Sequence, residues 1–409
     1  MRPTHHLALP ISLLLMSCGG STAAHLARAV ADTLPGGIPR VTSAGPTAWA
    51  DSTGARLVEE SRFSGEDGTP AEIGQPQSLA VDEEGRVYVV DTKPAVIKVF
   101  APDGSLVRNI GREGEGPGEF RVGFIAVRGG HVVIQDPELG RTSVWDTAGA
   151  FLRSWHSSCC YHSDIQIDRQ NRIHVPSAFG RRKGEPPRGV PYVRWSLQGD
   201  NLDSVWVPHR EATKVWKISI KGSDGDDVMA MILPIPLQPD VKSALHPEGG
   251  IVHGWTGAYW LTRSPAGSDS ARVFGRLWTP DAISDDRRTA AVEARIKQVS
   301  EGYGEENARR AFSLADVPGT LPAFAGLRVD EGGRTWVRRY PVTMADTART
   351  AFEVFDSAGA YLGPVSVPLR LPEFGLQAWT RNGLVAIVED DDGRPAVVRF
   401  RFHQGPDRP

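Results

Sequence analysis

One short segment of the chain combines residues that can do redox or metal chemistry. It contains Cys159, Cys160 and His162 within four positions. Adjacent cysteines can form a vicinal disulfide in an oxidising compartment, or they can remain packed thiols. With His162 they also offer ligands for a soft metal such as copper or zinc. No distant Cys-x-x-Cys or His-x-His motif completes such a site, and the only other cysteine is Cys18. All three interpretations stay open.

Two further groups are suited to binding. Arg181, Arg182 and Lys183 form a basic loop that can meet an anionic glycan or a lipid headgroup, or simply face solvent. Trp255 and Tyr340 each follow a short apolar run, where an aromatic side chain can contact a ligand or pack inside the fold. The sequence contains no nucleophile elbow, HExxH motif or phosphate loop. We therefore assign no catalytic residue, expect no cofactor, and favour a non-enzymatic function.

A repeat supplies the elements that position these residues. Its clearest copy, residues 77–110, contains four short apolar runs separated by tight turns. One turn is Pro102-Asp103-Gly104, in which Pro and Gly suit the restricted and positive φ angles of a turn. Four short antiparallel strands that recur along a chain are typical of a propeller blade.

Six copies of this unit are found. Their leading positions are Leu79, Ile125, Ile165, Leu245, Leu327 and Gln377. We therefore predict an all-β fold, a six-bladed β-propeller over residues 46–409. Residues 57–63 read as a strand with no blade of their own, and the last copy offers only three strands. The simplest closure of the ring adds 57–63 to that copy, which removes an open edge.

The first residues read as a targeting segment. Residues 1–17 have a short apolar core and end before Cys18, in the order Leu15-Met16-Ser17-Cys18 that resembles a bacterial lipobox. Acylation would make Cys18 a membrane anchor, and 18–45 its tether. The alternative is ordinary secretion with cleavage near Ala24. Gly19 favours the periplasmic side of the outer membrane in a Gram-negative cell.

Long loops are expected on one face of the propeller. In an up-and-down blade, the links between blades and the loops between strands two and three emerge together, and we call this side the insertion face. The largest insertion, 279–322, lies between blades four and five and has an apolar helical stripe. The stripe is expected either to pack on the propeller rim as a cap or to serve as a lid or docking element.

Two segments carry a family resemblance. Residues 111–120 (GREGEGPGEF) and 74–82 (GQPQSLAVD) resemble the consensus of NHL repeats. With the lipobox, the chain is similar to bacterial six-bladed NHL-like propeller lipoproteins. Some NHL-like lyases hold a metal through histidines in the central channel. The resemblance therefore gives His174 and His253 an alternative role as metal ligands, beside the simpler role of packed strand residues.

These observations define two function classes. The favoured one is a monomeric binding or scaffold module that holds a protein, peptide or glycan on the insertion face. The alternative is a metal-assisted lyase or hydrolase with its site at the channel mouth. The formal net charge of −3 argues against general affinity for nucleic acid.

Overall fold

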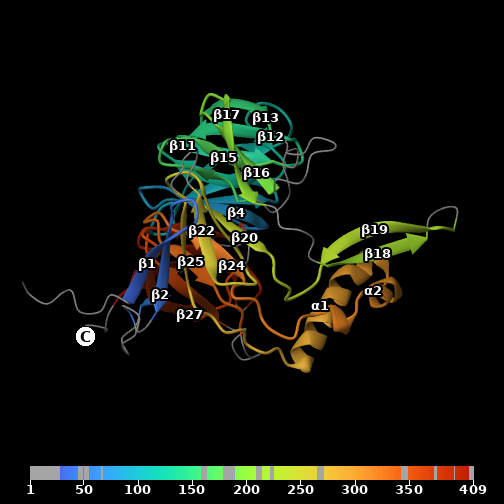
Figure 1. Ribbon diagram of the computed structural model, residues 1–409. Coiled ribbons are helices and arrows are strands. Elements are labelled where there is room, and N and C mark those ends of the chain that lie inside the picture. Colours follow the sequence, from blue (N-terminus) through green and yellow to red (C-terminus); the bar gives the residue numbers. More distant parts are fainter. Residues whose placement is uncertain are drawn as a thin grey trace, which may run out of the picture.

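The structure is a computed structural model. It describes residues 28–44, 49, 55–65, 68–157, 164–177, 189–208, 214–221, 225–264, 271–341, 349–372, 375–390 and 392–404. Neither of its two helices has the length and apolar character needed to cross a membrane. Six antiparallel sheets dominate the chain (Figure 1), which confirms the predicted all-β, six-bladed propeller.

The first three blades follow one another without added strands in their sheets. Blade 1 contains β4 (Pro76–Val81), β5 (Val87–Thr92), β6 (Ala95–Phe100) and β7 (Leu106–Ile110). The link to the next blade holds the short pair β8 (Arg112–Glu113) and β9 (Glu119–Phe120). Blade 2 contains β10 (Phe124–Arg128), β11 (His131–Asp136), β12 (Arg141–Asp146) and β13 (Phe151–His156). Blade 3 contains β14 (Gln166–Ile167), β15 (Ile173–Pro176), β16 (Gly189–Trp195) and β17 (Asn201–Pro208).

The last three blades complete the ring. Blade 4 contains β20 (Val241–Leu245), β21 (Ile251–Trp255), β22 (Trp260–Ser264) and β23 (Arg272–Arg276). Blade 5 contains β24 (Gly326–Val329), β25 (Thr335–Arg338), β26 (Thr350–Phe355) and β27 (Tyr361–Val367). Blade 6 contains β28 (Gln377–Thr380), β29 (Gly383–Glu389) and β30 (Pro395–His403), with β3 (Arg56–Phe63) as its outer strand.

The β3 strand joins the beginning of the chain to its end. It pairs antiparallel with β30, in a register that sets Leu57 opposite Phe402. Leu57 is only 2% exposed and packs in the core between blades 5 and 6. Because β3 pairs with β30, the sheet of blade 6 has no open edge at β30.

The core is divided among the contacts between neighbouring blades. Side chains of successive strand residues point to opposite faces of a sheet, so each blade presents one apolar set to each neighbour. In blade 1, Tyr88 and Val90 pack toward blade 2, whereas Val87 and Val89 pack toward blade 6. The seam between blades 3 and 4 has the smallest buried cluster, Val205, Val207, Leu245 and Ile251.

The predicted tether is wrong for part of its length. Residues 28–44 are not a linker but a hairpin, β1 (Arg28–Leu34) and β2 (Ile38–Ala44). The β2 strand pairs in parallel with β23 and so covers the outer edge of blade 4. Gly36 and Gly37, which read as linker composition, both have positive φ angles (86° and 77°) and form the hairpin turn.

The helical insertion between blades 4 and 5 is confirmed, but its packing differs from the expected cap on the propeller rim. Helix α1 (Asp285–Tyr303) and helix α2 (Glu305–Ala311), followed by the 3₁₀ turn η1 (Leu314–Asp316), pack against a hairpin inserted between blades 3 and 4. This hairpin is β18 (Val215–Lys221) and β19 (Asp227–Pro234). Figure 1 shows the four elements together, standing apart from the blades, and we call them the satellite lobe.

The satellite lobe has a hydrophobic core of its own. Val292, Ile296 and Val299 on α1 are buried against Trp216 and Ile218 of β18. Trp216 also stacks on Phe312, with ring centroids 4.5 Å apart. The apolar stripe of α1 thus finds its partner in another insertion, whose strands the sequence analysis did not predict. Both insertions leave the propeller on the insertion face.

Candidate functional site

A recurring acidic turn sits between the first and second strands of blades 1, 3 and 5, on the side opposite the insertion face, which we call the turn face. In each copy a buried Asp accepts the backbone N–H and the Nε–H of an Arg four residues later, and a donor on an aromatic ring six residues later. The Nε–Oδ2 distances are 2.6, 2.7 and 2.6 Å. The three sets are Asp82, Arg86 and Tyr88; Asp168, Arg172 and His174; and Asp330, Arg334 and Trp336.

This pattern assigns His174 a local partner. Its Nε2 lies 2.8 Å from Oδ2 of Asp168, and both side chains are almost fully buried. Burial lowers the pKa of His174, and the Asp168 hydrogen bond opposes this only in part. Burial alone would raise the pKa of Asp168, but hydrogen bonds from His174 and Arg172 outweigh it and lower that pKa to about 2. His174 therefore occupies the place that Tyr88 and Trp336 take in other blades.

The structure does not bring His174 and His253 together with further metal ligands. His253 lies on β21, where its Nε2 is 3.4 Å from the Ser264 hydroxyl. Within the described ranges, no three His, Cys, Asp or Glu side chains form a group that could hold a metal ion. The metal hypothesis thus gains no support from these two histidines.

Seven of the predicted site residues fall outside the part of the chain that the structure describes. These are Cys18, Cys159, Cys160, His162, Arg181, Arg182 and Lys183. Their roles stay predictions.

Tyr340 lies in a cleft on the insertion face, between blades 4 and 5 at the base of the satellite lobe. The cleft has a volume of about 320 Å³ and is also lined by Trp278, Leu277 and Arg339. Trp255 is half-buried at the end of β21 and does not line it. The binding role of Tyr340 stays a prediction, and Trp278, which follows blade 4 without a strand pattern around it, was not predicted.

A buried carboxylate lies at the bottom of this cleft. Glu353 on β26 accepts a hydrogen bond from the Tyr259 hydroxyl and one of 3.0 Å from Arg276. Arg339 is more loosely placed, 3.7 Å from Glu353 and 3.9 Å from Asp281. Burial, followed by the nearby Glu353 charge, raises the pKa of Tyr259, which keeps its proton. Both Glu353 oxygens are engaged, so this group stabilises the seam and shapes the cleft.

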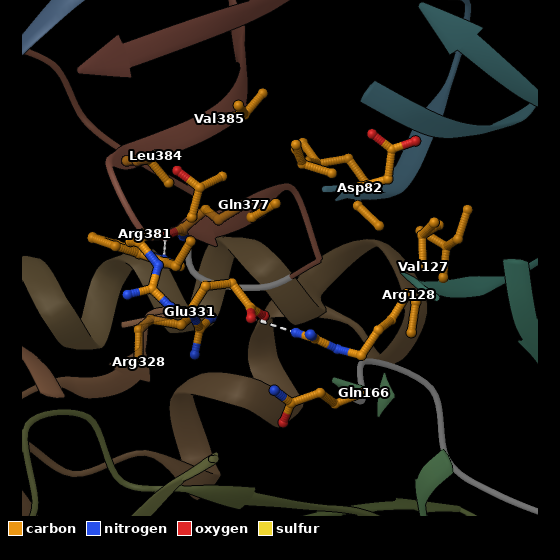
Figure 2. Close-up of a pocket in the computed structure, with 18 of the residues that line it drawn as sticks. Asp82, Val127, Arg128, Gln166, Arg328, Glu331, Gln377, Arg381, Leu384 and Val385 are labelled. Atoms are coloured by element: carbon orange, nitrogen blue, oxygen red, sulfur yellow. Dashed lines mark hydrogen bonds and ion pairs between the residues drawn. The ribbon is translucent and has the colours of Figure 1, made fainter. Parts of the chain in front are cut away.

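The innermost strands line a central channel with a volume of about 960 Å³. Figure 2 shows its polar side chains. At the turn face, Arg128 of blade 2 forms an ion pair with Glu331 of blade 5, and Glu83 lies 3.9 Å from Arg128. Blades 2 and 5 are opposite one another in a ring of six, so this ion pair spans the channel. Arg169 of blade 3 donates to the Glu331 backbone carbonyl and pairs with Glu248 at 3.3 Å.

Comparisons with known proteins agree with a propeller and go no further. A search with models of known protein families finds no match, and neither does a comparison with curated protein sequences. Similar solved structures include a "Putative exported protein" from Bacteroides fragilis, with a TM-score of 0.48 and 10% identity over 85% of this chain and 95% of that chain. A member of the DUF4221 family from Bacteroides vulgatus has a TM-score of 0.44 and 10% identity over 86% and 99%.

One enzyme is also among the similar structures. Virginiamycin B lyase from Staphylococcus aureus has a TM-score of 0.42 and 10% identity over 85% of this chain and 99% of that chain. Sequence identities and TM-scores this low indicate a similar fold only. No activity or ligand follows from them.

Proposed function

We propose that the protein is an exported, lipid-anchored propeller of the NHL-like type that binds a protein, peptide or glycan through its insertion face, as a monomer and without catalysis. The lipobox before Cys18 supports the anchor, on the periplasmic side of the outer membrane.

The satellite lobe is the observation that carries the proposal. The two long links between blades, residues 209–240 and 277–325, would be costly extensions if each faced solvent alone. Instead they build one lobe with its own core, beside a cleft that exposes Tyr340 and Trp278. Long loops held on one face of a rigid scaffold are where binding usually resides.

The hairpin of the lobe also offers apolar surface. Val228, Met229 and Ile232 of β19 are each about half exposed, at 51%, 54% and 52%. Large apolar side chains that cluster in this way on a surface are typical of interaction sites. The hairpin is therefore a second candidate contact site, in addition to the cleft.

Photo-crosslinking from the two faces tests the proposal. A photoreactive benzoylphenylalanine replaces Leu277, which is 76% exposed at the rim of the cleft. The matched control replaces Glu84, whose side chain is 67% exposed in a turn on the turn face. Both variants are expressed with the native leader in a Gram-negative cell.

We expect a discrete adduct from position 277 alone, and expect Tyr340→Ala to reduce its yield. Equal adducts from both positions, or none from 277, would contradict binding at the insertion face. An adduct from Glu84 alone would move the binding surface to the turn face.

A further inference from the structure

The wall of the central channel is uniform except at two positions. The residue two places before each turn on the turn face lines the channel in all six blades. These residues are Ala80, Ala126, Gln166, Ala244, Arg328 and Ala378. Four alanines leave this layer wide, because a methyl group fills little of the lumen. Gln166 and Arg328 are the only polar side chains in it.

Three guanidinium groups gather where this layer meets the turn face. Figure 2 shows Arg328 and Arg381 beside Glu331 on one wall, with Arg128 reaching Glu331 from the other. Arg328 also lies 3.5 Å from Asp164. Arg381 is exposed, and its guanidinium has no hydrogen bond or ion pair with the described residues. Glu331 and Glu83 lie against Arg128, and Asp164 lies against Arg328, so Arg381 is the guanidinium of the three that no described carboxylate neutralises.

The acceptor of Gln166 is also unsatisfied. Its Oε1 atom is buried, yet it has no hydrogen-bond partner in the described part of the chain. A buried polar atom without a partner costs about 1–3 kcal/mol, so such an atom marks a place where a donor is missing. A hydroxyl group on a ligand in the channel would supply that donor.

We propose that the channel binds a small hydroxylated anion carrying carboxylate or phosphate groups, at the turn-face mouth. Arg328 and Arg381 would hold its charged groups, because a planar guanidinium matches the geometry of both. Gln166 would accept from its hydroxyl. The Glu331 carboxylate already occupies Arg128 and repels an incoming anion, so it limits the affinity. This site lies on the face opposite the proposed binding surface and does not depend on it.

Titration calorimetry at low ionic strength tests the site on the folded protein. Citrate is the carboxylate probe, glycerol 3-phosphate is the phosphate probe, and glycerol is the uncharged control. We expect at least one of the two anions to bind at a stoichiometry of one, with affinity that falls as salt rises. No binding of either anion at millimolar concentration would overturn the proposal.

Paired substitutions identify the residues responsible. Arg381→Gln is expected to weaken binding by about tenfold or more, the size of one charge-assisted contact. Glu331→Gln is expected to strengthen binding roughly threefold or more, because it removes a like charge. Arg153→Gln, an exposed arginine on the outer strand β13, is the matched control.

The change in anion affinity caused by Glu331→Gln distinguishes a ligand-binding role of these charged side chains from a purely structural one. Tighter binding supports an anion site that Glu331 restrains. Weaker or unchanged binding, or equal effects of Arg381→Gln and Arg153→Gln, would show that these side chains only hold the blades together. Thermal unfolding of each variant verifies that it is folded before titration.

Discussion

Asp168 shows how one side chain can fix a turn between strands. It accepts from the backbone and side chain of Arg172 and from the His174 ring, all from within one hairpin. The carboxylate has to be ionised for these bonds to be strong. The same arrangement around Asp82 and Asp330 makes it a property of blades 1, 3 and 5, which accounts for a histidine at this position through a local hydrogen bond.

Asp168→Asn should therefore lower stability near neutral pH by about 2 kcal/mol, the size of the shift of its pKa from 3.8 to about 2. The pKa of Asp168 is lower in the folded protein than in the unfolded chain. The stabilisation is therefore fully present above about pH 4 and is lost as the pH falls toward 2. Urea unfolding from pH 7 to pH 2.5 measures it. The difference from wild type should shrink with acidity, and a difference that is constant across this range would contradict the assignment.

Asp286→Asn is the control for that experiment. Asp286 is exposed in the first turn of α1, and its loss should change stability by only a few tenths of a kcal/mol.

At this scale the sequence left open whether Tyr340 contacts a ligand or packs inside the fold, and the structure places it in the lining of the cleft. It could not predict Glu353, Tyr259 and Arg276 as a cluster, because these residues come from three strands in two blades. Likewise, nothing local in the sequence links Arg128 with Glu331, 203 positions apart. Only the closed ring makes them neighbours.

Among the elements, α1 is the one whose packing partner was missed. Its stripe of Val292, Ile296 and Val299 was visible from its helical spacing, whereas β18 and β19 lie in a link with no blade pattern. A hairpin that packs on a helix, rather than in a blade, lacks the repeat that identified the other strands. The strands β1 and β2 were not predicted for the same reason, because they also lie outside the repeat.

Ile296→Ala should unfold the satellite lobe without unfolding the blades. Removing a buried isoleucine side chain costs about 3 kcal/mol, and the lobe core is separate from the clusters between blades. Hydrogen exchange should rise in α1, α2, β18 and β19 and stay unchanged in blades 1 and 2. Lys297→Ala, at the exposed neighbouring position, should alter neither region. Exchange that rises equally throughout the chain would show that lobe and propeller form one cooperative unit.

The β3 strand permits an equally local test. Leu57→Asp places a charge in the core between blades 5 and 6 and should destabilise the protein by about 4 kcal/mol. Val58→Asp changes the adjacent residue, which is 37% exposed, and should cost far less. Thermal unfolding compares the two. Similar losses would mean that the register of β3 on β30 differs from the one described.

The whole molecule combines a regular ring with irregular attachments. Its six blades were predictable because the same pattern of apolar runs and turns recurs six times, so each weak copy is supported by the others. The attachments occur once each, and single occurrences give no such support.

Membrane attachment is a property at this scale. If Cys18 carries the lipid anchor, Cys18→Ala should move the protein from the membrane fraction to the soluble periplasmic fraction, because the acyl chains provide the affinity for the bilayer. Fractionation of cells expressing each form, followed by immunoblotting, measures this. Retention of the variant in the membrane fraction would show that another part of the chain attaches it.

The pairing of β3 with β30 also sets an order of events in time. Residues 56–63 are synthesised well before their partner strand at 395–403. Until then β3 has no sheet to join, and Leu57 has no core in which to bury. The ring therefore closes only once residues 395–403 are available to pair. During that interval β3 lacks its partner strand, which makes the period before closure the one most exposed to aggregation.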